Sequence, residues 1–361
     1  MTRELVIDGR RINDHEDCYI IAEIGHNHQG ELEKAKQLFH RAKECGVDAV
    51  KLQKRDNRTL FTGGMYDMPY EHESSFGRTY GEHREFLEFG MAEYIELKRY
   101  AEELGLVFFA TAFDIPSADF LAKLSVPCYK VASGDLKNIP LMKYIARFQK
   151  PMIVSTGGGT LEDAQRVYDT LKPIKAEFCF LHTTASYPTA PEEMNLRVIT
   201  KMRERFPDVV IGLSDHYNGI AMAPVAYVLG ARVIEKHFTL NHTWKGTDHP
   251  FSLEPICMQK MVRDLRRTRA AIGDGVKRAY SSESNAIYKM GKKLVAARDL
   301  PAGHRLTEAD IAIKSPGGGL PPYELERIIG NVTRRALKTD EAITLEILDD
   351  SASKVVGRSA G

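Results

Sequence analysis

The sequence predicts a parallel (β/α)8 barrel followed by a small β-rich module. Over most of the chain, eight apolar runs of strand length alternate with amphipathic segments of helical length, which is typical of a closed parallel barrel. From residue 293 onward the pattern changes to short β-type runs separated by Pro- and Gly-rich turns. A length of 361 residues suits one large and one small domain. An open, doubly wound sheet is the alternative, but residues 25–30 (GHNHQG) lack its dinucleotide fingerprint.

The elements follow one another in regular order. Residues 5–12 predict a hairpin around Asp8-Gly9 that caps the bottom of the barrel. The expected strands are residues 18–25, 48–54, 107–113, 128–133, 151–157, 178–184, 209–216 and 232–239. The expected helices are residues 31–45, 117–124, 139–148, 161–171, 195–206, 256–272 and a crossover helix within 217–231. Because such units place their strands in parallel, all the carboxyl ends meet at one rim.

Residues 55–90 are too long for an ordinary loop, so we expect them to form a partly ordered flap over this rim. We expect a barrel domain over residues 1–280, a polar linker over 281–292, the β-rich module over 293–351 and a frayed tail over 352–361.

Composition excludes several classes of protein. The 50 basic and 49 acidic residues nearly balance, which argues against a nucleic acid partner. No apolar run approaches the ~18 residues of a membrane span, and the first ten residues contain no signal-peptide core. The five cysteines are odd in number and never form CxxC, so we expect reduced thiols in a cytoplasmic protein.

Two histidines end neighbouring strands. His216 follows VVIGLSD and His237 follows RVIEK, so both imidazoles are expected at the same rim. Imidazole suits Zn, Mn, Fe or Co, and two histidines form half of an open metal site. The alternative is that each is a core histidine bonded to the backbone.

Lys51 and Lys130 lie inside apolar strands, where an ammonium group is costly unless it faces an anion. With Ser133 and Ser155 they would form a cradle for phosphate or carboxylate; the alternative is that both extend to solvent. Glu23 could be their counter-ion, or could orient a water molecule. Asp248 follows the last strand closely enough to reach a metal or its water, although a solvated loop aspartate is the alternative.

A barrel metallohydrolase is a competing class. His26 and His28 have its HxH spacing, and Lys130 lies on the strand where some of these enzymes carry a bridging lysine. Those hydrolases resemble one another in a histidine that ends strand five and an aspartate that ends strand eight. Here those ends carry Ser155 and His237, which argues against this class.

Seven motifs together resemble the sialic acid synthases. They are AEIGHNH (22–28), KLQ (51–53), YKVASGD (129–135), STG (155–157), YPT (187–189), GLSDH (212–216) and EKHFT (235–239). The C-terminal module looks like the antifreeze-like SAF domain of that family.

The resemblance implies a TIM-barrel transferase that condenses phosphoenolpyruvate with the open-chain aldehyde of an N-acylhexosamine, giving a nine-carbon 2-keto acid and phosphate. It implies that His216 and His237 hold Mn²⁺ or Mg²⁺, a Lewis acid for the aldehyde. It implies catalytic roles for Glu23, Lys51, Lys130 and Asp248. Substrate-binding roles are implied for Gln53, Thr111, Ser133, Asp135, Ser155, Tyr187 and Lys314.

The resemblance also implies a domain-swapped homodimer, in which the C-terminal module covers the partner's barrel mouth. Two positions depart from bacterial N-acetylneuraminate synthases, and both lie on the acceptor side. Ser315 replaces an arginine, and Ala185 replaces an asparagine. N-acetylmannosamine is the default acceptor, and a legionaminic- or pseudaminic-type precursor or a phosphorylated hexosamine is the alternative. A non-catalytic sugar-binding protein is a further alternative.

Overall fold

The computed structural model describes residues 3–349. The chain divides into two compact units, of which the first ends at Asp274 and the second begins at Gly275. The tail expected over residues 352–361 lies outside the described residues.

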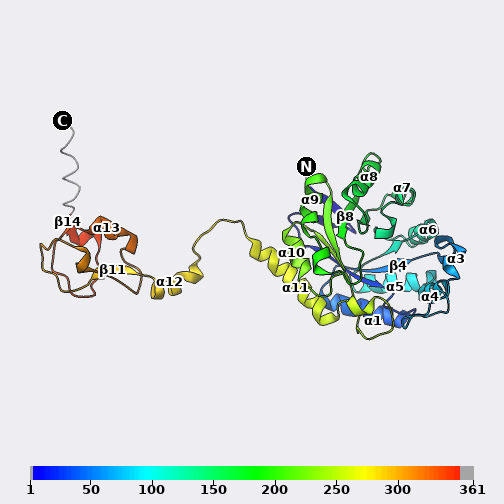
Figure 1. The fold of residues 1–361 in the computed structure, drawn as a ribbon, viewed down its shortest axis with the longest axis horizontal. Helices are drawn as coiled ribbons and strands as arrows, with labels where there is room; N and C mark the ends of the chain where they lie inside the picture. The colour runs from blue at the N-terminus through cyan, green and yellow to red at the C-terminus, as the bar shows by residue number, and fades with distance from the viewer. Residues whose placement is uncertain (1–2, 350–361) are drawn as a thin grey trace. The chain divides into compact units, whose positions relative to one another are not determined.

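The first unit contains a closed barrel of eight parallel strands, which confirms the predicted fold (Figure 1). The strands are β3 (Tyr19–Gly25), β4 (Ala49–Lys54), β5 (Val107–Ala112), β6 (Tyr129–Val131), β7 (Met152–Ser155), β8 (Phe178–Thr183), β9 (Val210–Asp215) and β10 (Val233–His237). Strand β10 closes the barrel against β3 and pairs His237 with Glu23, while β4 pairs Lys51 with Glu23. Three polar residues from three strands therefore lie at one level near the carboxyl ends.

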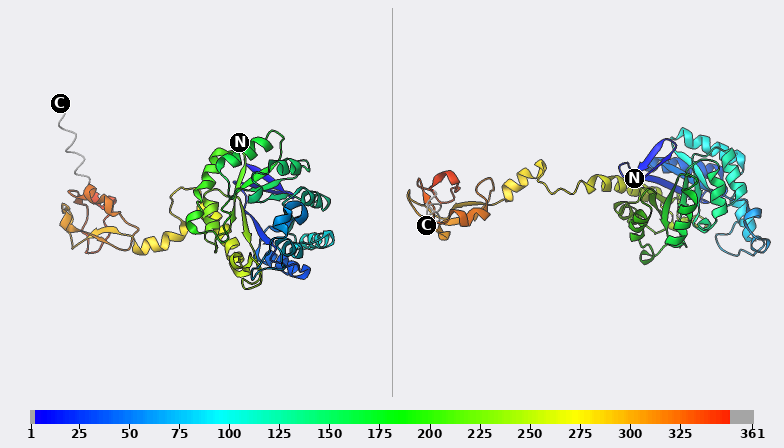
Figure 2. Two further views of the ribbon diagram at one scale, coloured as in Figure 1. Left: turned by 45° about the vertical axis from the view of Figure 1, so that its right-hand side comes forward. Right: turned by 90° about the horizontal axis from the view of Figure 1, so that it is seen from above.

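Amphipathic helices surround the strands (Figures 1 and 2). They are α1 (Leu32–Cys45), α5 (Met91–Glu103), α6 (Ile115–Lys123), α7 (Ile139–Ala146), α8 (Leu161–Leu171), α9 (Arg197–Arg205), α10 (Met222–Val228) and α11 (Pro255–Ile272). Side-chain caps start several of them: Asp114, Asn138 and Thr160 each accept a hydrogen bond from a backbone N–H of the first turn. The buried face of each helix packs on the strands, so one core fills this unit.

The N-terminal hairpin, β1 (Glu4–Ile7) and β2 (Arg10–Asn13), forms as predicted. Ile7 and Ile12 are fully buried and belong to the barrel core. Arg10 extends from the hairpin to Asp48, which also accepts from the Ile20 backbone N–H at 2.7 Å. The hairpin is therefore anchored to the amino ends of the strands, opposite the rim.

The expected flap contains three short helices, α2 (Asn57–Leu60), α3 (Gly63–Tyr66) and α4 (Tyr80–Leu87). The Tyr66 side chain is buried beneath α4, where a Cβ on Gly81 would overlap its ring. The Arg58 guanidinium lies 3.6 Å from the centroid of the same ring. The Tyr66 ring thus contacts residues of both α2 and α4.

The second unit is a small β-rich module. The segment expected as a polar linker contains helix α12 (Ser284–Met290), after which come β11 (Lys293–Ala296), β12 (Ile311–Lys314), α13 (Leu325–Ile328), β13 (Val332–Thr333) and β14 (Leu348–Asp349). A separate core includes Leu294, Leu306 and Ile343. Asp310 is fully buried in this unit and accepts from Arg298, His304 and Thr307.

All five cysteines are free. Among residues 3–349, no helix combines the length and the apolar composition that crossing a bilayer requires.

Candidate active site

A cavity of about 580 Å³ opens at the carboxyl ends of the barrel strands. Most of the residues selected from the sequence line it: Glu23, Lys51, Gln53, Thr111, Lys130, Ser133, Ser155, Tyr187, His216, His237 and Asp248. They come from the ends of many different strands, which is the usual construction of a site on this fold.

Lys51 and Lys130 are buried and form a connected polar network at the bottom of this cavity. The Lys51 Nζ lies 2.7 Å from Glu23 Oε2 and donates to Thr111 Oγ1 at 2.8 Å. The Lys130 Nζ lies 3.2 Å from Glu235 Oε1 and donates to Ser155 Oγ at 2.7 Å. Because both ammonium groups stay in the barrel interior, the alternative that they extend to solvent is wrong.

Glu235 joins the two lysines, and the sequence analysis did not select it. Its carboxylate lies 3.2 Å from Lys130 Nζ and 3.8 Å from Lys51 Nζ, and it accepts from Ser214 Oγ at 3.0 Å. Although burial raises its pKa, the two lysines hold the pKa of Glu235 below the usual range. Glu235 precedes His237 by two residues, so strand periodicity directs both side chains to the same face. This spacing in the sequence could have identified Glu235 as a site residue.

The two imidazoles are 5.5 Å apart between ring centroids, with the Tyr187 ring 4.2 Å from that of His216. The His216 Nδ1–H donates to the Thr184 carbonyl at 2.8 Å, which leaves the Nε2 lone pair available. Burial lowers the pKa of His216 to about 3, so this ring is neutral at physiological pH.

These histidines fit a divalent metal ion. The buried His237 Nδ1 has no hydrogen-bond partner within residues 3–349, and it lies 3.6 Å from Asp248 Oδ2. An unpaired imidazole nitrogen beside a carboxylate and a second neutral imidazole suits Mn²⁺ or a similar ion. No group of three or more His, Cys, Asp or Glu side chains within the described part of the chain forms a fuller ligand set. An ion held here would therefore leave positions open to water or substrate.

Gly25 allows three polar side chains to approach one another. A Cβ at this position would lie 3.2 Å from Asp248 Oδ2, 3.3 Å from Gln53 Nε2 and 3.4 Å from Glu23 Oε1. The backbone φ of +53° also favours glycine. Gln53 donates to Glu23 at 2.7 Å, so this cluster links the lysine network to the outer part of the cavity.

Two selected residues do not line the cavity. Asp135 lies on a 3-10 turn after β6, and its carboxylate accepts from Asn138 Nδ2 at 2.9 Å. Lys314 belongs to the second unit, where it pairs with Asp340 on an exposed surface.

The HxH pair does not form a metal site. His26 lies between two guanidinium groups, with its Nε2 3.2 Å from Arg55 Nη1 and its Nδ1 3.2 Å from Arg84 Nη1. His28 stacks on Phe89 and accepts from the Gly30 backbone N–H at 3.1 Å. Two cations beside His26 would repel a metal ion. Neither arginine was predicted from the sequence as a site residue: Arg55 directly follows β4, and Arg84 lies on α4 of the flap.

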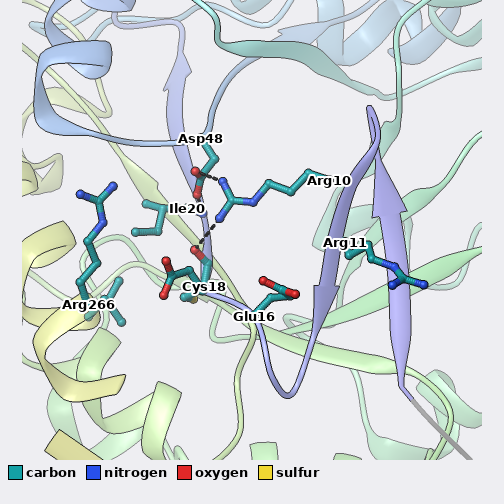
Figure 3. A pocket seen from close by; sticks show the side chains of 9 residues that line it. Arg10, Arg11, Glu16, Cys18, Ile20, Asp48 and Arg266 are labelled. Atoms are coloured by element: carbon teal, nitrogen blue, oxygen red, sulfur yellow. Dashed lines mark hydrogen bonds and ion pairs between the residues drawn. The ribbon is translucent and has the colours of Figure 1, made fainter. Parts of the chain in front are cut away.

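A second cavity of about 480 Å³ lies at the opposite end of the barrel (Figure 3). Arg10 extends into it toward Asp48 and the Cys18 carbonyl, with Arg266 on the other side (Figure 3). Its acidic and basic groups are mixed and several are paired, so it carries no charge pattern comparable with that of the rim.

Known proteins share this architecture. The sequence matches the NeuB family over residues 38–277 and the SAF domain family over residues 293–348. The chain is 40% identical to the N-acetylneuraminate-9-phosphate synthase of Homo sapiens, covering 96% of this chain and 97% of that protein. It is 34% identical to the N,N'-diacetyllegionaminic acid synthase of Campylobacter jejuni, covering 90% and 98%. The crystal structure of an N-acetylneuraminic acid synthetase from Leptospira borgpetersenii, in complex with citrate, superimposes with a TM-score of 0.69 at 30% identity, covering 80% of this chain and 96% of that one.

Proposed function

Because the chain belongs to the NeuB family of sialic acid synthases, we propose that it condenses phosphoenolpyruvate with the open-chain aldehyde of an N-acylhexosamine. The products are a nine-carbon 2-keto acid and inorganic phosphate. The observation that carries this proposal is the presence of two buried lysines and two neighbouring imidazoles in one cavity.

Lys51 and Lys130, with Thr111, Ser133 and Ser155, would bind the phosphate and carboxylate of phosphoenolpyruvate. Hydrogen bonds from ammonium and hydroxyl groups to these anions are charge-assisted and therefore strong. Buried lysines also cost little to reorganise when the substrate enters, because Glu23 and Glu235 already hold them in position.

The chemistry then has three steps. The electron pair of the C2–C3 double bond of phosphoenolpyruvate forms a bond from C3 to the aldehyde carbon, which leaves C2 cationic, while the π bond of the aldehyde breaks and its oxygen takes up a proton to become a hydroxyl. Water adds to the cationic C2, and Glu23 orients it and accepts its proton. The C2 hydroxyl then loses its proton to the departing phosphate as the bond between C2 and the phosphate oxygen breaks, which releases phosphate and leaves the 2-keto group.

We propose that His216 and His237 hold Mn²⁺ or Mg²⁺. When bound, such an ion acts as a Lewis acid toward the aldehyde oxygen. Asp248, beside His237, would bind sugar hydroxyls or a water molecule of the ion. Tyr187 would form a wall of the acceptor site against His216.

We propose three classes of acceptor, because relatives named for different products share this barrel. N-acetylmannosamine is the simplest candidate, and a legionaminic- or pseudaminic-type precursor or a phosphorylated hexosamine are the others. The family resemblance supports a homodimer in which the C-terminal module, with Lys314, covers the barrel mouth of its partner.

The test is acceptor-dependent release of phosphate on mixing the protein with phosphoenolpyruvate, Mn²⁺ and each candidate aldehyde, with the keto acid identified by mass spectrometry.

Lys130→Met should raise the KM for phosphoenolpyruvate far more than that for the acceptor. His216→Ala and His237→Ala should abolish turnover and also weaken binding of Mn²⁺ alone, measured by calorimetry. Full activity in the metal-stripped double variant would refute the metal assignment.

A further inference from the structure

The rim carries a second cationic group apart from the lysine network. Arg55 directly follows β4, and Arg84 lies on α4 of the flap. Both line the cavity together with Tyr70 and Tyr80. His26 lies between the two guanidinium groups, with each ring nitrogen 3.2 Å from one of them.

The protein does not satisfy these guanidinium groups by itself. A neutral imidazole can accept only one hydrogen bond, because its other nitrogen carries the proton. His26 can therefore satisfy at most one of the two arginines. The Arg84 Nε is buried without a hydrogen-bond partner, and within residues 3–349 no carboxylate pairs with Arg84.

Arg55 shares its nearest carboxylate with another cation. Its Nη1 lies 3.8 Å from Glu88 Oε1, while Glu88 Oε2 is held by Lys54 at 2.9 Å. One carboxylate thus faces two cations here. Burial, together with Arg84, lowers the pKa of Arg55 to about 10. An anion between the two guanidinium groups would remove this unfavourable arrangement.

The position of this cationic group relates it to the acceptor rather than to phosphoenolpyruvate. Gln53 lies between it and the lysine network, since Arg55 donates to Gln53 Oε1 at 2.6 Å and Gln53 donates to Glu23 at 2.7 Å. Asp248 lies 3.6 Å from His237 Nδ1 and lines the same cavity as Arg55 and Arg84. An open-chain sugar whose aldehyde lies at the imidazoles would therefore extend past Asp248 toward the arginines.

We propose that Arg55 and Arg84 bind a phosphate group on the end of the acceptor remote from its aldehyde, so that the substrate is an N-acylhexosamine phosphate. This rests on the proposed condensation and names its substrate class. Two forked guanidinium groups match a phosphate monoester, which offers three acceptor oxygens. The Tyr80 hydroxyl, which accepts from Arg84 Nη2 at 2.9 Å, keeps that fork in place.

The experiment compares N-acetylmannosamine with its 6-phosphate as acceptors for the wild type, Arg84→Met and Arg84→Lys. Arg78→Met is the matched control, because Arg78 lies on the same flap but is exposed and pairs with Glu82. We expect Arg84→Met to lower kcat/KM for the 6-phosphate by about 10- to 100-fold, as loss of a charged hydrogen bond predicts. Arg84→Lys should recover part of this loss, and Arg78→Met should have no effect.

Binding of the two acceptors reduced at C1, which cannot react, provides a readout independent of turnover. Calorimetry should show that the reduced 6-phosphate binds the wild type more tightly than the reduced unphosphorylated sugar, and that Arg84→Met removes this difference. Equal kcat/KM for both acceptors, or an equal effect of Arg84→Met on both, would overturn the phosphate subsite and leave the condensation intact. An effect of Arg84→Met confined to the KM for phosphoenolpyruvate would also overturn it. Failure to condense either aldehyde would instead contradict the proposed function.

Discussion

At the scale of single residues, Glu235 sets the charge of the lysine network. The buried carboxylate lies between Lys51 and Lys130, and Glu23 contacts Lys51 from the other side. Two cations and two anions thus balance, and each of the four side chains is almost fully buried. An isolated buried charge would cost far more than this arrangement.

We predict that Glu235→Gln leaves this network with an excess positive charge. Breaking a buried ion pair typically costs about 3–5 kcal/mol, so the free energy of unfolding should fall by a few kcal/mol and turnover by at least about tenfold. Denaturant unfolding and phosphate release measure the two effects. The control is Glu204→Gln, which removes an exposed carboxylate paired with Lys201 and should change neither. Wild-type stability in Glu235→Gln would contradict the assigned pairing.

A second prediction at this scale concerns the replacement of Gly25, and Gly9 in the N-terminal hairpin provides the control. Gly25 and Gly9 both have positive φ, but a Cβ at Gly9 would meet nothing within 4 Å. Each change to alanine should cost about 1–2 kcal/mol of stability through backbone strain. Only Gly25→Ala should also abolish turnover, because its Cβ displaces Asp248 and Gln53. Equal activity of the two variants, assayed by phosphate release, would show that this close approach is unimportant.

The sequence predicted those site residues that end strands, because the last residue of a parallel barrel strand faces the rim. It did not predict Glu235, although the spacing of two residues between Glu235 and His237 on one strand indicated that both side chains face the same side. It also missed Arg55, which directly follows β4, and could not predict Arg84, whose position depends on how the flap folds. Their partner, His26, was noticed only for its HxH spacing.

At the scale of elements, the strands were predicted within a few residues, whereas the flap helices were not. Helices α2, α3 and α4 are too short to show a hydrophobic period. The buried Tyr66 side chain on α3 contacts both other helices, and its hydroxyl donates to Glu85 at 3.3 Å. Tertiary contact rather than local propensity therefore determines this segment.

Tyr66→Ala should loosen the flap without unfolding the barrel. Removing a buried aromatic side chain leaves a cavity beneath α4, so we expect limited proteolysis within residues 57–87 to accelerate by at least about tenfold. The KM for the acceptor should rise while that for phosphoenolpyruvate stays nearly constant, because the lysine network lies on the strands. Met65→Ala, on the same helix but partly exposed, is the control. An equal rise in the KM for the acceptor and the KM for phosphoenolpyruvate would contradict the assignment of the flap to the acceptor side of the cavity.

At the scale of the whole molecule, each of the two units has its own core. In the second unit Asp310 is fully buried beside this core. Its carboxylate accepts from Arg298 Nη2 at 2.6 Å, His304 Nε2 at 2.9 Å and the Thr307 N–H at 2.9 Å. Although burial raises its pKa, these donors hold the pKa of Asp310 far below the usual value of 3.8.

Because the folded pKa is depressed, Asp310 stabilises the second unit fully at pH values above its unfolded pKa and loses this contribution as the pH falls toward its folded pKa. Asp310→Asn should therefore destabilise this unit by about 2–3 kcal/mol at pH 7, with a difference from the wild type that shrinks below about pH 4. Hydrogen exchange at pH 7 should show lost protection confined to residues 293–348, and calorimetry should follow the pH series. Asp349→Asn, at an exposed pair with Arg334, is the control. Lost protection in the barrel would contradict the independence of the two cores.

The central claim is that the lysine and histidine groups of one cavity join phosphoenolpyruvate to an aldehyde, with water attacking C2. The most direct test is turnover in ¹⁸O-labelled water, with the released phosphate analysed by mass spectrometry. The account predicts unlabelled phosphate, because the bond that breaks joins C2 to the phosphate oxygen. Label in the phosphate would mean that water attacks phosphorus, and phosphate release without the aldehyde would mean that release does not require carbon–carbon bond formation; either result would contradict the account.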